Sequence, residues 1–346
     1  MRRAQVVLNA RVTRRATITG VERWAHEVIP RLLSRAPERY VVATPPPAAS
    51  SGPLGYAWEQ LVLPLLAARA RAKVIFSPAN LAPLGWPGNV LMLHDATVLR
   101  EPDAYSRPYR AWHRTVGIRG ARRALMVLTV SEFSRRELVE LADLDPQLVR
   151  VVSGGVDSRF TPNADHQRVA KKLGLNAPYV LTVATRDERK NLSTLGFAAQ
   201  ALARDGIELV WAGDERPQFS PNADLDAVRR LGYVDDADLP GLYRGASAFV
   251  LPSRYEGLGL PCLEAMACGT PVVAADRGAL PETCGDAALL VDPDDPEAVC
   301  QALFQAIGDS LVRTRLREAG LQRVAPRAWD RATGQIDDVL VELLSA

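Results

Sequence analysis

The chain has 346 residues, 47% of them hydrophobic and 24% charged, which is typical of globular proteins and excludes a disordered chain. The length suits two domains, and no apolar run approaches the roughly 18 residues of a membrane-spanning helix. The net charge of +2 is uneven, because residues 1–130 carry 19 Arg and Lys against 7 Asp and Glu, whereas residues 131–346 carry 23 against 33.

The basic first part of the chain leaves two interpretations open. It could meet an anionic partner, such as a membrane surface or a phosphorylated acceptor, or its arginines could simply solvate one face. Nucleic acid is not expected, because no basic and aromatic recognition motif accompanies the charge. The start, MRRAQVVLNARV, is interpreted as a first strand and not as a signal peptide. The apolar stretch 58–68 (WEQLVLPLLAA) predicts a core helix, with a membrane-contact surface as the alternative.

Short runs of Val, Ile and Leu alternate with amphipathic stretches along the whole chain. This alternation predicts an α/β fold with parallel sheets covered by helices on both faces. Each half has enough strands for its own doubly wound sheet. The predicted strands are 6–8, 40–43, 74–76, 90–93, 125–130 and 149–152 in the first half, and 179–183, 208–211, 248–251, 271–274 and 288–291 in the second.

The boundary between the halves is expected in the turn-forming stretch SGGVDSRFTPN, which begins at Ser153. We predict an N-terminal Rossmann-like domain over 1–158 and a C-terminal Rossmann-like domain over 159–325. The last segment, 326–346, predicts an amphipathic helix that crosses back to the first domain. Open α/β sheets bind ligands at the carboxyl ends of their strands, so two such domains facing a central cleft would suit a charged donor and an acceptor.

The segment 254–282 (RYEGLGLPCLEAMACGTPVVAADRGALPE) is the most informative one. Its glycines let the backbone approach a ligand, and Pro261 fits the first turn of a helix. The amides of Leu258, Gly259 and Leu260 would then form an anion site at the helix start. Glu256 and Glu264 would repel a diphosphate and instead suit the hydroxyls of a sugar and a ribose. The alternative is an ordinary glycine-rich turn with a glutamate favoured by the helix dipole.

A basic cluster, 185–191 (TRDERKN), directly follows the strand predicted at 179–183. A departing diphosphate needs fixed positive charge, which Lys190 and Arg189, and secondarily Arg186, could supply. The alternative is a solvated basic turn.

The segment around the two glutamates closely resembles the signature of the retaining glycosyltransferase family 4 (group 1), in which two Glu are separated by seven residues. Glu256 and Glu264 have that spacing, and the flanking LGYVDDADLPGLYRGASAFVLPS and GTPVVAADRGALPETCGDAALLVDP are similar to the family as well. So are TVSEFSRREL, SGGVDSRFTP, VATRDERKNL and the late Trp329. The resemblance covers nearly the whole chain and implies a GT-B fold, a nucleotide-sugar donor and retention at the anomeric carbon. It also implies that the domain over 1–158 lies on the acceptor side and that the domain over 159–325 binds the nucleotide sugar.

The resemblance also implies roles for individual residues. Glu264 matches the family's ribose-binding Glu, and Glu256 matches the Glu beside the transferred sugar. Leu258 stands where the family often has Phe, and Thr185 where many relatives have Arg. In the first half, Gly20 matches a glycine loop that closes over the donor phosphates, although Thr19 replaces its second Gly.

Other positions follow from the same resemblance. His94 follows the strand predicted at 90–93 and matches a family His beside the transferred sugar, although a lone His is more often structural. Asp103 and Tyr105 could touch the acceptor. The strand-like stretch 232–234, ending in Val234, would edge the base pocket.

The acidic runs 235–238 (DDAD) and 292–295 (DPDD) could suggest a metal site, but both lie where helix N-caps are expected. We therefore predict no metal and no cofactor, the nucleotide sugar being a co-substrate. The four cysteines form no C-x-x-C pair and are expected as buried free thiols.

These observations predict a retaining hexosyltransferase that is cytoplasmic and could touch the inner face of the membrane. The Arg-Lys-Asn sequence resembles bacterial mannosyl- and rhamnosyltransferases of surface polysaccharides, which implies mannose, from GDP-mannose, or a deoxyhexose as the sugar. The acceptor would be a glycan or a lipid-linked glycan. A nucleotide-sugar epimerase and a non-catalytic sugar-nucleotide-binding subunit remain as alternatives. An oxidoreductase is disfavoured, because no G-x-G-x-x-G follows the first strand.

Overall fold

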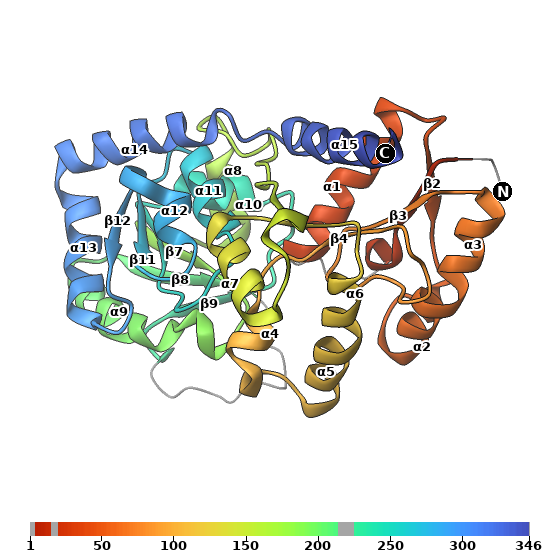
Figure 1. Cartoon of the computed structure of the whole chain (residues 1–346). Helices are drawn as coiled ribbons and strands as arrows, with labels where there is room; N and C mark the ends of the chain where they lie inside the picture. The colour runs from red at the N-terminus through yellow and green to blue at the C-terminus, as the bar shows by residue number, and fades with distance from the viewer. Residues whose placement is uncertain (1–3, 15–19, 214–224, 346) are drawn as a thin grey trace. The chain divides into compact units, whose positions relative to one another are not determined.

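The computed structural model describes residues 4–14, 20–213 and 225–345. The chain forms two compact units, the first built from Met1–Gly155 and Trp329–Ala346 and the second from Val156–Ala328 (Figure 1). The boundaries thus lie three residues from the expected 158 and 325. Each unit contains one six-stranded sheet. Among the described residues, no helix combines the length and apolar character needed to cross a membrane.

The sheet of unit 1 has the strand order β2-β1-β3-β4-β5-β6, and every pair of neighbours is parallel. Four of its strands are buried along their whole length, as expected for a parallel sheet covered on both faces. The strands are β1 (Val6–Asn9), β2 (Tyr40–Ala43), β3 (Val74–Ser77), β4 (Asn89–Met92), β5 (Met126–Thr129) and β6 (Val149–Val151).

Eight α-helices of the described residues surround this sheet (Figure 1). Two pairs of them are joined by π-helical turns. Trp58–Val62 joins α2 to α3 and His113–Gly117 joins α5 to α6, so that 52–70 and 107–122 are each helical throughout. The helices are α1 (Gly20–Arg35), α2 (Gly52–Ala57), α3 (Leu63–Ala70), α4 (Thr97–Arg100), α5 (Arg107–Trp112), α6 (Ile118–Arg122), α7 (Glu132–Ala142) and α15 (Trp329–Ser345).

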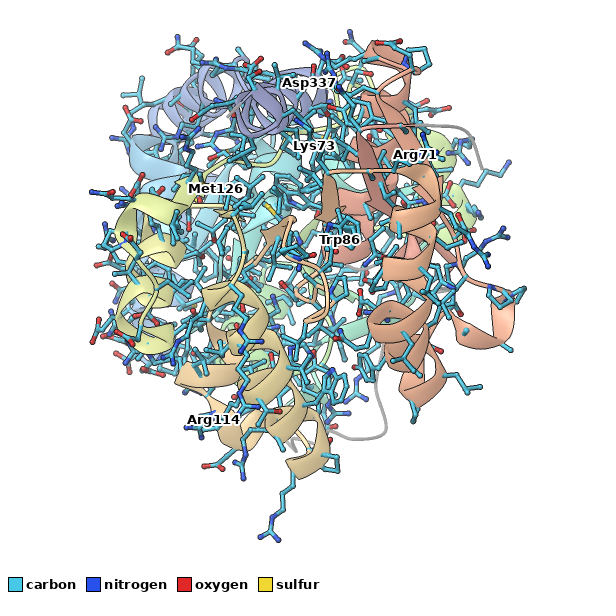
Figure 2. The ribbon with its side chains drawn as sticks, turned by 45° about the vertical axis from the view of Figure 1, so that its right-hand side comes forward. Arg71, Lys73, Trp86, Arg114, Met126 and Asp337 are labelled. Carbon is cyan, nitrogen blue, oxygen red and sulfur yellow. The ribbon has the colours of Figure 1, made fainter. Side chains whose placement is uncertain are left out.

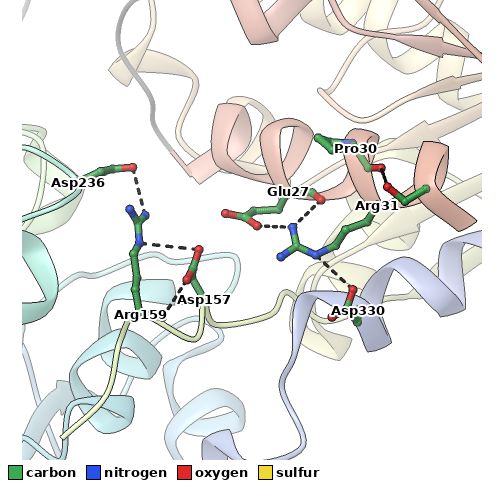
Figure 3. A network of polar contacts seen from close by, with 8 residues as sticks. Glu27, Pro30, Arg31, Asp157, Arg159, Asp236 and Asp330 are labelled. Atoms are coloured by element: carbon green, nitrogen blue, oxygen red, sulfur yellow. Dashed lines mark hydrogen bonds and ion pairs between the residues drawn. The ribbon is translucent and has the colours of Figure 1, made fainter. Parts of the chain in front are cut away.

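Helix α15 packs on α1 although their sequences are about 300 residues apart. The Trp329 ring meets Trp24 edge-on with centroids 5.1 Å apart. The Arg31 guanidinium lies between Glu27 and Asp330, 3.4 Å from the Asp330 carboxylate (Figure 3). The final helix of the chain is therefore an integral part of unit 1.

The helix predicted for the core at 58–68 is only half correct. Trp58, Leu63 and Ala67 are buried, but Leu61 and Leu65 are 69% and 60% exposed. The two polar residues of this stretch, Glu59 and Gln60, bond to the interior of unit 1, so the leucines on the other side of the helix remain in solvent.

The sheet of unit 2 has the order β12-β11-β10-β7-β8-β9 and is again wholly parallel. This is the doubly wound order. The chain adds strands in one direction from β7 to β9, returns to the middle of the sheet, and adds β10 to β12 in the other direction, so the strand order reverses between β7 and β10. The strands are β7 (Tyr179–Val183), β8 (Glu208–Ala212), β9 (Arg229–Gly232), β10 (Ala248–Leu251), β11 (Val272–Ala275) and β12 (Ala288–Val291).

Seven α-helices of the described residues belong to unit 2. Large cores lie on both faces of its sheet, one containing Tyr243 and Phe249 and the other Trp211 and Leu303. The helices are α8 (His166–Leu173), α9 (Leu195–Arg204), α10 (Leu239–Gly245), α11 (Leu260–Ala267), α12 (Leu280–Cys284), α13 (Pro296–Gly308) and α14 (Ser310–Val324).

All eleven predicted strands are present, and β9 is the strand that the sequence prediction missed. Its residues, RRLG, are partly exposed and lack the β-branched residues of the central strands, because β9 is an edge strand. The prediction of a strand-like stretch at 232–234 is correct only for Gly232, where β9 ends, and wrong for the two residues after it.

Candidate active site

The strand-switch point of unit 2 brings together the two segments that carry the predicted charges. Strands β7 and β10 are neighbours, and residues 188–190 and the loop with Glu256 follow their carboxyl ends. The chain after β7 forms a short 3₁₀ turn, Glu188–Lys190, whose start is capped by the Asp187 side chain. Asn191 closes the turn in the left-handed conformation at φ 52°. This turn presents two consecutive basic side chains at the carboxyl edge of the sheet.

Lys190 and Glu256 form an ion pair across the switch point. The Lys190 Nζ donates to Glu256 Oε1 at 2.5 Å, and the two side chains are only 12% and 9% exposed. Burial alone would raise the pKa of Glu256, but the charges of Lys190 and Arg189 outweigh it and hold that pKa below its usual value. The site therefore contains a buried carboxylate and a buried ammonium that neutralise each other.

Arg189 is held beside this pair by three bonds. Its Nε lies 2.9 Å from Asp187 Oδ2, and its Nη1 donates to the Tyr255 carbonyl at 3.3 Å. The Arg189 carbonyl accepts from the Arg254 amide at 2.8 Å. The loops after β7 and β10 are thereby tied together, and the guanidinium has a fixed position.

The loop after β10 turns into α11 through Gly259, which has φ 85°. A Cβ at Gly259 would lie 2.5 Å from the Leu280 side chain, so both the conformation and the space favour glycine. The helical bonds begin where Cys262 N donates to the Gly259 carbonyl at 3.0 Å. The amides of Leu258, Gly259 and Leu260 precede that bond, as predicted for an anion site at the helix start.

Glu264 lies in the second turn of α11 and is also buried. Its Oε2 accepts from the Tyr243 hydroxyl at 3.0 Å, and burial together with the Glu264 charge raises the pKa of Tyr243. Phe160 and Phe249 pack on the Tyr243 ring at centroid distances of 5.8 and 5.4 Å. Tyr243 therefore fixes the Glu264 carboxylate, a role that sequence reasoning missed even though the residue stands in the LPGLYRG motif.

His94 is the buried candidate of unit 1. Its Nε2 lies 2.9 Å from the Pro78 carbonyl, which can only accept, so Nε2 carries the hydrogen and Nδ1 is the acceptor. The ring meets Trp24 edge-on at 5.6 Å. Burial lowers the pKa of His94, against the opposing effect of the Pro78 carbonyl. The imidazole is thus neutral at neutral pH.

The remaining predicted positions are less informative. Gly20 begins α1, and no atom of the described residues lies within 4 Å of a Cβ placed there, while Thr19 lies outside the described residues. Val234 is buried just beyond β9. Asp103 is exposed and pairs with Arg110 at 2.9 Å, and the Tyr105 ring stacks on Tyr109 at 5.2 Å.

Carboxylates of both acidic runs have partners within the protein, one in a helix cap and one in ion pairs. Asp295 caps α13 by accepting from the amides of Glu297 and Ala298, as predicted. The capping prediction is wrong for Asp238, whose side chain makes no cap and instead pairs with Lys172 and Arg168. No group of three or more metal-ligating side chains occurs within residues 4–14, 20–213 and 225–345. The four cysteines are free and buried, as predicted.

Two family descriptions match the chain. Residues 177–309 match "Glycosyl transferases group 1", and residues 24–160 match "Glycosyltransferase Family 4", which together cover most of the chain. Among curated proteins, the chain is 36% identical over 225 residues to the O-antigen chain mannosyltransferase B of Escherichia coli. It is 32% identical over 237 residues to the D-inositol 3-phosphate glycosyltransferase of Salinispora arenicola. These matches cover 61% of this chain in both cases, and only 59% and 53% of the relatives.

Solved structures resemble the chain over nearly its full length. The sucrose-phosphate synthase of Thermosynechococcus elongatus matches with a TM-score of 0.78 at 21% identity, covering 99% of this chain and 100% of that one. HepE of Anabaena, solved in complex with UDP and glucose, matches with a TM-score of 0.73 at 20% identity, covering 98% and 99%. The two parallel-sheet units therefore have the GT-B fold of these glycosyltransferases.

Proposed function

Since the chain belongs to the glycosyltransferases of group 1 and family 4, we propose that it transfers a hexose from a nucleoside-diphosphate sugar to a glycan or lipid-linked acceptor with retention of configuration. The observation that carries the proposal is the buried Lys190–Glu256 pair at the strand-switch point, with Arg189 beside it. A buried ion pair is costly to desolvate, and it is suited to a site where a charged ligand replaces one partner. A donor diphosphate would take the place of Glu256 next to Lys190.

The charges suit the departure of the diphosphate. Breaking the anomeric C–O bond leaves negative charge on a phosphate oxygen, which Lys190, Arg189 and the amides of 258–260 would stabilise. Glu256, released from Lys190, would accept hydrogen bonds from the sugar hydroxyls. The acceptor hydroxyl would attack from the face that the phosphate leaves, and the leaving oxygen would take its proton.

Contacts to the ribose, the base and the sugar complete the proposed donor site. Glu264 would bind the ribose hydroxyls through the carboxylate that Tyr243 orients, and Val234 would edge the base. In unit 1, the His94 Nδ1 would accept a hydrogen bond from the sugar, and the backbone at Gly20 would approach the phosphates. The proposed reaction uses no metal and no cofactor, so we expect activity to survive excess chelator. The proposed location is cytoplasmic.

The proposed sugar is mannose, from GDP-mannose, or a deoxyhexose, for surface polysaccharide. The mannosyltransferase activity that the relative is named for supports this proposal, while the UDP bound to HepE supports a nucleotide-sugar donor more generally. Thermal-shift measurements with GDP, UDP, dTDP and ADP test the donor class, because a bound ligand stabilises the folded state. Selective stabilisation by GDP is expected, and selective stabilisation by UDP or ADP would exclude GDP-mannose.

Turnover of the donor separates the proposal from its alternatives. A transferase consumes the donor slowly by hydrolysis without acceptor and faster by transfer when acceptor is present, giving a glycosylated acceptor that has the donor's anomeric configuration by NMR. Conversion of the donor sugar to another sugar without acceptor would identify an epimerase. Tight donor binding in calorimetry without any hydrolysis or transfer would identify a non-catalytic binding subunit.

A further inference from the structure

The helical segment 52–70 of unit 1 exposes leucines along its outer side. Leu54, Leu61 and Leu65 are 62%, 69% and 60% exposed, and Val62 is 39% exposed. They stand on one continuous helix, so they form an apolar row and not scattered single residues. Ala57 and Ala68 of the same row are exposed as well.

Two polar side chains in the middle of this segment, Glu59 and Gln60, bond to the interior of unit 1, whereas Arg69 near its end is exposed. Glu59 is 1% exposed, pairs with Arg11 at 3.3 Å and accepts from Asn9 Nδ2 at 2.6 Å. Gln60 bonds to the Ala82 carbonyl at 3.1 Å and the Leu84 amide at 3.0 Å. The segment thus reverses the usual polarity of a surface helix, with its carboxylate inside and its leucines outside.

The surroundings of the apolar row are basic. Arg71 and Lys73, both exposed, follow the end of α3 (Figure 2). The neighbouring helical segment 107–122 contacts the row's own helix through the rings of Trp112 and Tyr56, 5.2 Å apart. Residues 104–131 contain six arginines and no Asp or Glu, and Arg107, Arg114 and Arg119 are exposed.

We infer that this face of unit 1, the apolar row with its flanking arginines, docks on an anionic lipid bilayer. Leucines would enter the boundary between headgroups and acyl chains, while Arg71, Arg107, Arg114 and Arg119 would pair with lipid phosphates. A bilayer fits both features at once, because it offers apolar depth and negative charge over one extended surface. The inference goes beyond the transfer reaction and does not depend on its donor.

Vesicle flotation tests the inference on the full chain. Wild type should float with phosphatidylcholine vesicles that contain phosphatidylglycerol, and much less with phosphatidylcholine alone at low salt. The double variant Leu61→Gln/Leu65→Gln should bind the anionic vesicles about tenfold more weakly or worse, since interfacial binding scales with buried apolar area. The matched control is Leu311→Gln, at an 82% exposed leucine of α14 in unit 2, which should bind like wild type.

The basic contribution has its own variants. Arg114→Gln/Arg119→Gln should weaken binding to the anionic vesicles at low salt, whereas Arg315→Gln on α14 should not, and high salt should reduce the difference. Equal binding of wild type to both vesicle types, or unchanged binding of Leu61→Gln/Leu65→Gln, would overturn the inference. So would failure of wild type to bind any vesicle, which would point instead to a protein partner for the leucines.

Nucleotide binding measured on the same preparations keeps the two proposals distinguishable. The Leu61→Gln/Leu65→Gln variant should keep the wild-type affinity for the nucleoside diphosphate, because the charged cluster lies in unit 2. A protein that binds vesicles but no nucleotide would refute the transferase proposal and support the docking surface. A protein that binds nucleotide but no vesicles would do the opposite.

Discussion

The strand ends of the two units present different chemistry. In unit 2, a buried ammonium and a buried carboxylate meet at 2.5 Å with a guanidinium beside them. In unit 1, the buried side chain beyond β4 is a neutral imidazole held by a carbonyl and an indole. Two parallel sheets with the same number of strands therefore create different sites. One contains an ion pair whose ammonium can bind an anionic ligand, and the other offers a neutral hydrogen-bond acceptor. An anionic group suits the first site, and hydroxyl groups suit the second.

The largest effect should come from the charged site. Lys190→Ala should lower turnover by roughly 100- to 1000-fold, the usual scale for losing one contact that stabilises charge in a transition state. Steady-state kinetics with the donor measures it. The control is Lys171→Ala, at an exposed lysine of α8 in the same unit, which should retain wild-type turnover. Near-normal activity of Lys190→Ala would remove the charged site from the mechanism.

The two glutamates should separate in a second experiment. Glu264→Ala should weaken free nucleoside diphosphate and donor alike by about tenfold or more, because a charged hydrogen bond to the ribose is worth roughly 1.5–3 kcal/mol. Glu256→Ala should lower the catalytic rate and leave nucleotide affinity unchanged or higher, since it frees Lys190 for the diphosphate.

Calorimetry with the nucleoside diphosphate and kinetics with the donor give the two readouts. The opposite pattern, with nucleotide affinity lost in Glu256→Ala and kept in Glu264→Ala, would reverse the assignment of the two carboxylates.

How far the sequence predicts the molecule differs between these regions. The strands of both sheets are predictable because parallel strands buried on both faces are short apolar runs. The edge strand β9 is not predicted, because its residues, RRLG, are not an apolar run. The charged loops are predictable because Lys190, Glu256 and Gly259 all lie within about eight residues of the carboxyl end of a predicted strand. The role of Tyr243 is not predictable from the sequence, because its hydrogen bond to Glu264 on another helix depends on how the two helices pack. The exposed leucines of 52–70 also escape prediction, because apolar periodicity does not say which side of a helix meets the sheet.

The neutral site of unit 1 should make stability depend on pH. Because burial lowers the pKa of His94 below the ordinary 6.5, the unfolded chain binds a proton that the folded chain refuses as pH falls through that value. The contribution of the neutral imidazole is fully present above pH 6.5 and decreases by about 1.4 kcal/mol per pH unit down to the folded-state pKa. His113, with its pKa lowered to about 4 mainly by burial, should add to the same loss.

Urea unfolding followed by tryptophan fluorescence measures this at pH 7.5 and 5.5, since five of the six tryptophans lie in unit 1. His94→Gln, which keeps a donor for the Pro78 carbonyl, should lose less stability on acidification than wild type. An identical loss in both proteins would show that His94 is not buried as a neutral group.

The smallest effect concerns the hydroxyl that orients Glu264. Tyr243→Phe keeps the ring against Phe160 and Phe249 but removes the donor to Glu264 Oε2. Nucleotide affinity should fall about two- to tenfold, because a net hydrogen bond is worth about 0.5–1.5 kcal/mol and the carboxylate itself remains. The effect should be smaller than that of Glu264→Ala.

Tyr179→Phe is the matched control for this change. The Tyr179 hydroxyl is also buried and donates to the Leu242 carbonyl at 2.6 Å, on the same helix as Tyr243. Loss of the Tyr179 hydroxyl should lower the free energy of unfolding about as much as loss of the Tyr243 hydroxyl does, without changing nucleotide affinity. If Tyr243 acts through Glu264, adding Tyr243→Phe to Glu264→Ala should weaken nucleotide binding no further. Additive losses in the double variant would mean that Tyr243 stabilises the site in some other way than by orienting the carboxylate.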